Sequence, residues 1–168
     1  MKTNLANLMN MVSEFDRNFN MVDGNLRSHI YTTTIEELDG RKTIVEDFRE
    51  DFKNEFIEYN ELFEKIQIIK QTIAMKNNEL KLPNGDTISD TLITINLLRK
   101  KQFLIEAFLN GKNSKRRITE VNNSYFESKE INFDSQAMKD LYEKIQSEIQ
   151  HLEFEISKLN SKEFDVMI

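Results

Sequence analysis

Positively charged residues are concentrated in one short segment of a chain that is otherwise acidic. Residues 99–117 carry seven cations and one acid, whereas the formal net charge of the whole chain is -6. Arginine binds phosphate through two parallel hydrogen bonds, and lysine adds a compact positive charge. The seven cations are Arg99, Lys100, Lys101, Lys112, Lys115, Arg116 and Arg117. The chemistry that this segment offers is therefore the binding of an anion.

Neutral neighbours add to this chemistry. Asn113 and Ser114 offer hydrogen bonds without charge, and the ring of Tyr125 offers a stacking surface. A phosphorylated or nucleotide-like small molecule would use all of these groups. The residues predicted to bind such a ligand are Arg99, Lys112, Asn113, Lys115, Arg116, Arg117 and Tyr125.

The same cations have a second interpretation, in which the chain itself neutralises them. A cation near the C-terminus of a helix is stabilised by the helix dipole by about 0.3 to 1 kcal/mol. Residues 36–65 carry eleven acids and five cations, so they offer an acidic surface to the basic segment. The sequence leaves both interpretations open: a ligand site on a basic loop, or a solvated and internally paired loop.

The sequence contains few of the residue patterns that catalysis or metal binding requires. The chain has no cysteine, which removes disulfides, zinc-thiolate sites and thiol nucleophiles. Its two histidines, His29 and His151, are far apart in the sequence, and His151 is interpreted as a partly exposed residue of a helix. Glycine-rich phosphate loops, zinc-binding histidine pairs and nucleophile elbows are absent. We therefore expect no catalysis, no metal and no cofactor.

Composition indicates where such a protein works. The negative net charge disfavours binding to nucleic acid polymers and to anionic membranes. No stretch of 18 apolar residues is present, and the N-terminal segment lacks the pattern of a signal peptide. We expect a cytoplasmic protein. Self-association and an anionic small molecule are the partners that the sequence favours.

Apolar spacing of three and four residues predicts long helices. One helix is expected from residue 5 to residue 22 and a second from 43 to 80. The apolar ridge of the second helix is interpreted as core, and it comprises Val45, Phe48, Phe52, Phe56, Tyr59, Phe63, Ile66, Ile69 and Ile73. Residues 29–45 are rich in β-branched side chains and contain an Asp-Gly pair, so they predict an irregular loop or a short hairpin.

The third helix is apolar on more than one side. Thr87 and Asp90 form a capping box that predicts its start near residue 88, and Gly111 predicts its end. Ile88, Leu92, Ile95, Leu98, Ile105 and Leu109 share one face, and Ile93, Leu97, Leu104 and Phe108 widen it. Such a helix lies centrally among others or gives its extra face to another subunit.

The last segments complete the predicted architecture. Residues 118–133 predict a small hairpin or an extended arm, and Asp134 or Ser135 is predicted to cap a fourth helix. The expected fold is all-α: an elongated helical bundle or antiparallel coiled coil of about four helices, with a small β-hairpin or extended arm. We expect one domain that covers residues 1–168.

Four segments of the chain resemble the septicolysin-like family of small helical bacterial proteins. The residues that carry the resemblance are Asn77, the stretch KLPNGDTISDTL at 81–92, YFESKEINF at 125–133 and the final helix through Asn160. The resemblance covers about the last 100 residues. The chain departs from the family pattern at Ile95 and Asn96, where the family has an Arg-Asp pair, and at Ser161, where it has tryptophan. The resemblance implies a helical fold, and the family name implies an action on membranes.

These observations favour function by binding over function by turnover. We expect a non-catalytic, oligomeric helical protein that sequesters a phosphorylated or nucleotide-like ligand at the basic loop, as a small bacterial or phage protein would. The alternatives are a structural coiled-coil adaptor for a protein partner and a cytolysin-like protein that acts on membranes.

Overall fold

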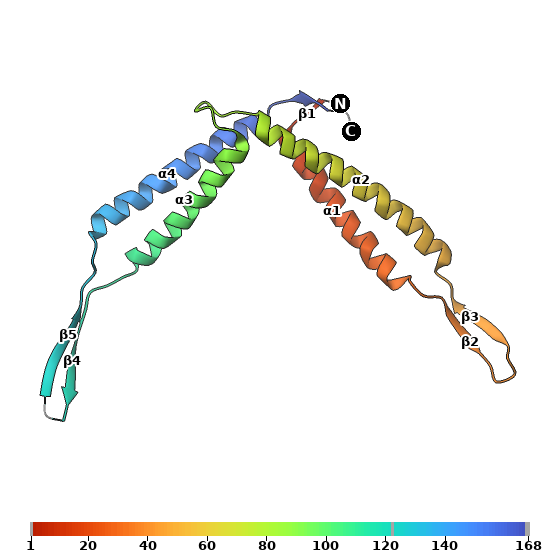
Figure 1. Cartoon of the computed structure of the whole chain (residues 1–168), viewed down its shortest axis with the longest axis horizontal. Helices are drawn as coiled ribbons and strands as arrows, with labels where there is room; N and C mark the ends of the chain where they lie inside the picture. The colour runs from red at the N-terminus through yellow and green to blue at the C-terminus, as the bar shows by residue number, and fades with distance from the viewer. Residues whose placement is uncertain (1, 122, 167–168) are drawn as a thin grey trace. The chain divides into compact units, whose positions relative to one another are not determined.

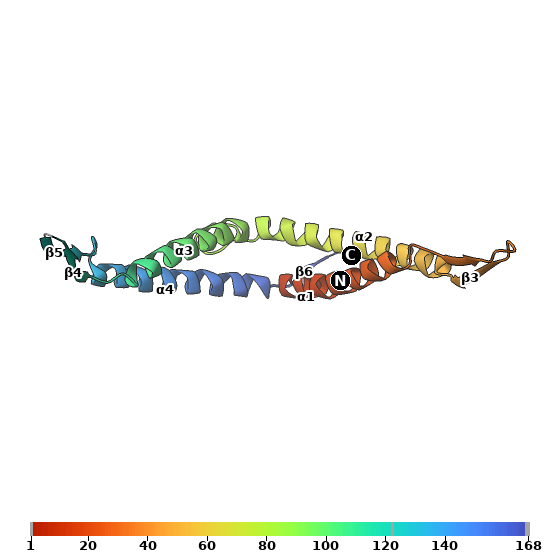
Figure 2. The same cartoon turned by 90° about the horizontal axis from the view of Figure 1, so that it is seen from below.

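The computed structural model describes residues 2–121 and 123–166, which are mostly helical (Figures 1 and 2). The helices are α1 (Leu5–Ser28), α2 (Arg49–Glu79), α3 (Ile88–Leu109) and α4 (Ser135–Asn160). The strands are β1 (Lys2–Thr3), β2 (Thr33–Glu36), β3 (Lys42–Glu46), β4 (Ser114–Glu120), β5 (Asn123–Lys129) and β6 (Phe164–Asp165). These strands form three two-stranded antiparallel sheets, β1 with β6, β2 with β3 and β4 with β5. The expected helical fold is thus confirmed in its coarse form, with more strand than the sequence predicted.

The chain divides into two compact units with the same order of elements. The first unit holds residues up to 80 together with the segment from 159 onward, and the second holds residues 81–158. In each unit a β-hairpin joins two helices: β2 and β3 lie between α1 and α2, and β4 and β5 lie between α3 and α4 (Figure 1). The expectation of a single domain stays a prediction.

In the first unit, α1 and α2 pack along their apolar sides. Asn4 caps α1, because its side chain accepts a hydrogen bond of 2.8 Å from the backbone N–H of Asn7. The three-four apolar spacing predicted for α1 is confirmed, since three of its residues are buried and three are half-buried: Leu5, Leu8 and Val22, and Val12, Phe15 and Phe19. The buried residues of the two helices are Leu5, Leu8, Val22, Leu62, Ile66 and Ile69.

The prediction for α2 was wrong at its start and on part of its face. The helix begins at Arg49, and the β-branched residues before it form β3. The inward side of α2 runs through Leu62 and Ile69, and Phe63 lies about 100° round the helix from Leu62. Phe52, Phe56 and Phe63, which were predicted as core, are therefore 36%, 50% and 53% exposed. Val45 belongs to β3 and is also exposed.

Two segments for which the sequence left alternatives open both form β-hairpins. Residues 33–46 form a hairpin whose turn contains Gly40 at φ 86°, a conformation that favours glycine. Residues 114–129 form a second hairpin of two seven-residue strands. The expectation of a loop at 112–117 was wrong from Ser114 onward, because these residues pair with β5. A two-stranded hairpin alone is only marginally stable in water, and both hairpins are largely exposed.

The start of α3 is fixed as the sequence predicted. The Thr87 hydroxyl accepts a hydrogen bond of 3.1 Å from the Asp90 N–H, and the Asp90 carboxylate accepts one of 3.3 Å from the Thr87 N–H. The turn before it contains Gly85 at φ 93°. The Thr87 hydroxyl also donates to the Asp90 carboxylate, and these bonds lower the pKa of Asp90.

Helix α3 presents apolar side chains on two opposite sides. Its buried side includes Ile88, Thr91, Ile95 and Ile105. On the other side lies what we call the outer α3 stripe, whose members are 62%, 60%, 53% and 38% exposed: Ile93, Leu97, Leu104 and Phe108. Leu92, predicted on the buried face, is 47% exposed, because it lies about 100° round the helix from Thr91.

Helix α4 completes the second unit. The Asp134 carboxylate caps it by accepting hydrogen bonds of 2.8 and 3.1 Å from the N–H groups of Gln136 and Ala137. Ile145, Ile149 and Ile156 are its buried residues. An ion pair between Arg99 of α3 and Glu153 of α4 joins the two helices, which lie side by side in Figure 1. None of the described helices combines the length and the apolar character that crossing a lipid bilayer requires.

The packing of α2 predicts that replacing two adjacent isoleucines by alanine lowers the free energy of unfolding by very different amounts. Ile69 is fully buried and Ile68 is 45% exposed. We expect Ile69→Ala to lower the free energy of unfolding by about 2 to 5 kcal/mol, because it leaves a cavity, and Ile68→Ala to lower it by less than about 1 kcal/mol. Urea unfolding at one protein concentration measures both. Equal losses would contradict the assigned face of α2.

The capping box predicts a pH dependence. A lowered pKa means that the folded protein prefers the Asp90 carboxylate, so its stabilisation is complete above the ordinary value of 3.8 and is lost as the pH falls below it. Asp90→Ala should therefore destabilise the protein at pH 7 and should differ progressively less from the parent below pH 3.8. Thermal unfolding across this range measures the effect.

Glu106 supplies the matched control on the same helix. Its carboxylate lies in the last turn, where it opposes the helix dipole, so Glu106→Ala should not destabilise the protein at pH 7. A constant difference between Asp90→Ala and the parent at every pH would contradict the role of the carboxylate.

Candidate functional site

The predicted anion-binding residues lie mainly on and beside the β4–β5 hairpin, whose base is tightly built. The Asn113 side chain accepts a hydrogen bond of 2.8 Å from the backbone N–H of Ile131 and so ties the two ends of the hairpin together. The rings of Phe108 and Phe133 meet at 5.8 Å between centroids. A Cβ atom at Gly111 would lie 3.0 Å from the Phe108 carbonyl oxygen, so a larger residue would crowd this base. Asn113 thus has a structural partner of its own.

Strand pairing sorts the cations of the hairpin onto two faces. Successive side chains of a strand point to opposite faces, and paired residues of neighbouring strands share a face. Lys115 pairs with Ser128, and Arg117 pairs with Phe126. The face that these pairs form is called the cationic face, and it comprises Lys115, Arg117, Thr119, Ser124, Phe126 and Ser128. None of these six residues is an acid.

The cationic face offers an aromatic ring beside its charges. The Phe126 ring is 63% exposed, and the ammonium nitrogen of Lys115 lies 5.0 Å from its centroid. Arg117 makes no ion pair among the residues that the structure describes. An exposed guanidinium, an ammonium and a ring can together bind an anion attached to a planar group.

The opposite face of the hairpin is internally neutralised. Arg116 pairs with Glu127 across the strands, and the guanidinium and carboxylate are 2.5 Å apart. The Tyr125 hydroxyl donates a hydrogen bond of 3.4 Å to the Glu120 carboxylate. Both predicted ligand residues on this face, Arg116 and Tyr125, are therefore turned away from Lys115 and Arg117.

Of the remaining predicted residues, Arg99 is neutralised by an acid of the described chain and Lys112 is not. Arg99 pairs with Glu153 in the middle of the helical part of the unit, and about 15 Å of helix separates it from the C-terminus of α3. Lys112 is exposed in the short segment before β4 and makes no ion pair within the described parts of the chain. The structure thus brings Lys115 and Arg117 together, with Lys112 close to them in sequence, and separates Arg99, Arg116 and Tyr125 from them.

Phe126 is the member of this site that the sequence analysis missed. The alternation of β4 contains the signal, because residues 115 and 117 share a face only if the segment is a strand. The segment was predicted to be a loop, and the residues of a loop have no regular alternation that would place Lys115 and Arg117 on one face. Tyr125 was chosen as the stacking ring, but pairing places it opposite Ile118 on the other face.

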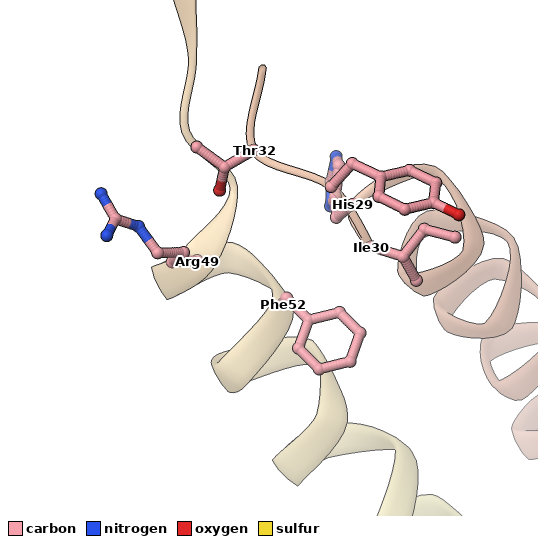
Figure 3. Close-up of a pocket in the computed structure, with 6 residues that line it drawn as sticks. His29, Ile30, Thr32, Arg49 and Phe52 are labelled. Atoms are coloured by element: carbon pink, nitrogen blue, oxygen red, sulfur yellow. The ribbon is translucent and has the colours of Figure 1, made fainter. Parts of the chain in front are cut away.

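A second candidate site is a small cavity at the base of the first hairpin. It has a volume of about 200 Å³ and is lined by His29, Ile30, Tyr31, Thr32, Arg49 and Phe52. Figure 3 shows Thr32 and Arg49 on one side, His29 and Ile30 on the other, and the Phe52 ring projecting from α2 below them.

The charged groups of this cavity are already engaged. The His29 ring stacks on Phe48 at 4.4 Å, and its Nδ1 lies 2.8 Å from the Glu55 carboxylate. Arg49 pairs with Asp47 and lowers the pKa of that carboxyl to about 2 through side-chain hydrogen bonds. Among the described residues no cluster of three or more histidine or acidic side chains could hold a metal ion. The contacts of His29 with Phe48 and Glu55 hold the chain where it leaves α1. They leave few groups in this cavity to bind a ligand.

The other histidine matches its interpretation from sequence. His151 is exposed on α4 beside the half-buried Leu152. It borders an open cavity of about 480 Å³ together with Asn84 and Glu148.

Comparison with known proteins establishes the fold but no activity. No family model matches the chain, and no curated protein matches it. One solved structure with a similar fold is that of a functionally unknown conserved protein from Corynebacterium diphtheriae. It is 18% identical, the match covers 98% of this chain and 100% of that one, and the TM-score is 0.64. The resemblance to the septicolysin-like family stays a prediction.

Proposed function

We propose that the chain is a non-catalytic, self-associating helical protein that captures a phosphorylated or nucleotide-like ligand on the cationic face of the β4–β5 hairpin. The observation that carries the proposal is the sorting of charge by strand alternation. Lys115 and Arg117 share a face with an exposed phenylalanine ring and without an acid. Cations that only served solubility would have no reason to avoid the acids of their own hairpin.

The charge balance of the hairpin supports the same conclusion. Residues 114–129 contain four cations and two acids. One cation and one acid cancel in the pair between Arg116 and Glu127, which leaves Lys115, Arg117 and Lys129 against Glu120. Lys129 pairs with Ser114 and so lies on the face opposite Arg117. A local positive field remains on a protein whose total charge is negative, and such a field attracts small anions.

A second candidate function is that of a structural adaptor for a protein partner, in which the helices complete a bundle or an antiparallel coiled coil. The outer α3 stripe favours this candidate, because apolar side chains that remain exposed along a helix are typical of an interaction surface. In that case the cationic face would contribute no ligand binding.

The proposal predicts that ATP binds and that binding depends on the cationic face. We expect Arg117→Glu to weaken binding at least tenfold, because it removes one charge-assisted contact and adds a repelling charge. Isothermal titration calorimetry with ATP, and with adenosine for comparison, measures this effect. Adenosine should bind far more weakly than ATP.

Lys129→Glu provides the matched control, since it makes the same change of charge on the same hairpin but on the opposite face. It should change ATP binding by less than about threefold, because a side chain on the opposite face does not contact the ligand and acts only as a charge screened by solvent. Equal losses in the two variants would show that only the net charge matters. Absence of ATP binding to the parent protein would remove this ligand class and leave the adaptor.

A further inference from the structure

The outer α3 stripe is a row of large apolar side chains that are exposed in the described part of the chain. Its members repeat at intervals of four and seven residues, so they lie within about 60° of one another round the helix. The buried side of α3, which faces the interior of the second unit, lies on the opposite side. Ile93, Leu97 and Leu104 are 53% to 62% exposed, and Phe108, whose ring meets that of Phe133, is 38% exposed.

Helix α2 carries a second uncovered row, which we call the α2 aromatic stripe: Phe52, Phe56 and Phe63. These rings are 36%, 50% and 53% exposed. Phe63 also borders a groove of about 430 Å³, whose other walls are Asp16, Phe19, Ile66, Gln67 and Lys70. Its volume is large enough to accept a side chain from outside the first unit.

The two stripes match when they run in opposite directions. From Leu97, the outer α3 stripe continues after seven residues to Leu104 and after four more to Phe108. The α2 aromatic stripe, followed backwards from Phe63, has the same intervals of seven and four. Equal intervals on antiparallel helices bring every apolar residue of one row opposite an apolar residue of the other.

The hairpins fix the same register. Phe108 lies six residues before Ser114, where β4 begins, and Phe52 lies six residues after Glu46, where β3 ends. Placing Phe108 opposite Phe52 therefore brings the two hairpins to the same end of the helix pair. In this register Leu97 faces the groove beside Phe63.

We propose that α3 of one copy of the chain packs antiparallel against α2 of a second copy. Phe108 then faces Phe52, Leu104 faces Phe56, and Leu97 faces Phe63. This inference rests on the self-association in the proposed function and names the surface that performs it. When each copy gives its α3 to the other, the assembly closes as a two-fold dimer with two such helix pairs.

Charge favours this pairing over the pairing of two α3 helices. Between Arg49 and Lys65, α2 carries six acids and three cations. Lys100 and Lys101 of the partner helix would lie level with Asn60 and Tyr59 in the middle of this segment, where α2 has no cation between Lys53 and Lys65. Two antiparallel α3 helices with their stripes in contact would instead bring Lys100 and Lys101 against their own copies, and like charges repel.

The hairpins are complementary in the same sense. Residues 33–46 contain four acids and two cations, and residues 114–129 contain two acids and four cations. Glu37 and Asp39 share Arg41, and Glu46 makes no ion pair within the described chain. A net charge of -2 on one hairpin thus approaches a net charge of +2 on the other, which selects the antiparallel direction.

Disulfide trapping tests the register, because the chain has no cysteine of its own. Phe56→Cys and Leu104→Cys are introduced into separate chains, which are co-expressed with two different tags and oxidised with diamide. The proposal predicts a cross-linked dimer that contains both tags. Ile57→Cys with Leu104→Cys is the matched control, since Ile57 is 52% exposed but lies about 100° round α2 from Phe56. Its cross-linking should be at least tenfold lower.

A chain that carries both Phe56→Cys and Leu104→Cys separates the alternatives. If it forms a cross-linked monomer while the separate chains form no dimer, α2 and α3 meet within one chain and the proposal is overturned. Equal cross-linking of the Phe56 and Ile57 variants would overturn the register. If the separate chains form no cross-linked dimer but the protein still binds ATP, the proposed interface is refuted and the proposed anion site is not affected.

Discussion

The constraint on which the account depends is the apolar character of α3 on two opposite sides. One unit can bury only one of these sides, and the second unit does so through Ile88, Ile95 and Ile105. The outer α3 stripe is left in water, which is unfavourable by about 25 cal/mol for each Å² of apolar surface. A helix that only formed part of a self-contained pair would carry polar residues there, as α1 does at Asn10, Asn18 and Asn20. In the proposed pairing, α2 of a second copy buries this stripe.

The second constraint is the two-residue period of a β-strand. It places the three consecutive cations Lys115, Arg116 and Arg117 on two different faces of the hairpin. Arg116 is neutralised by Glu127, whereas Lys115 and Arg117 keep their charge beside Phe126. The same rule explains why the net charge of the segment overstates the number of groups available to an anion. A binding surface on this hairpin consists of few groups, and its specificity depends on how they combine with the exposed ring.

The sequence predicted the elements whose signals are local. The three-four spacing of α1 and the capping box at Thr87 and Asp90 are properties of neighbouring residues, and the structure confirms both. Burial along α2 was not predictable in the same way. The inward direction of α2 is set by how it packs on α1, and a row that includes Phe52, Phe56 and Phe63 satisfies the helical period almost as well as the true inward row. Pairing of β4 with β5 likewise joins residues that only the turn brings together.

Two units with the same order of elements give the chain two hairpins of opposite charge and two uncovered helix faces with matching intervals. These features are independent of one another in the sequence, yet all are consistent with one pairing of α2 and α3 between copies. The most direct test of the account is sedimentation velocity on the unmodified chain over a hundredfold range of micromolar concentrations. The proposed dimer should appear as a species of twice 19.9 kDa that persists on dilution. A species of 19.9 kDa at every concentration would rule out the dimer.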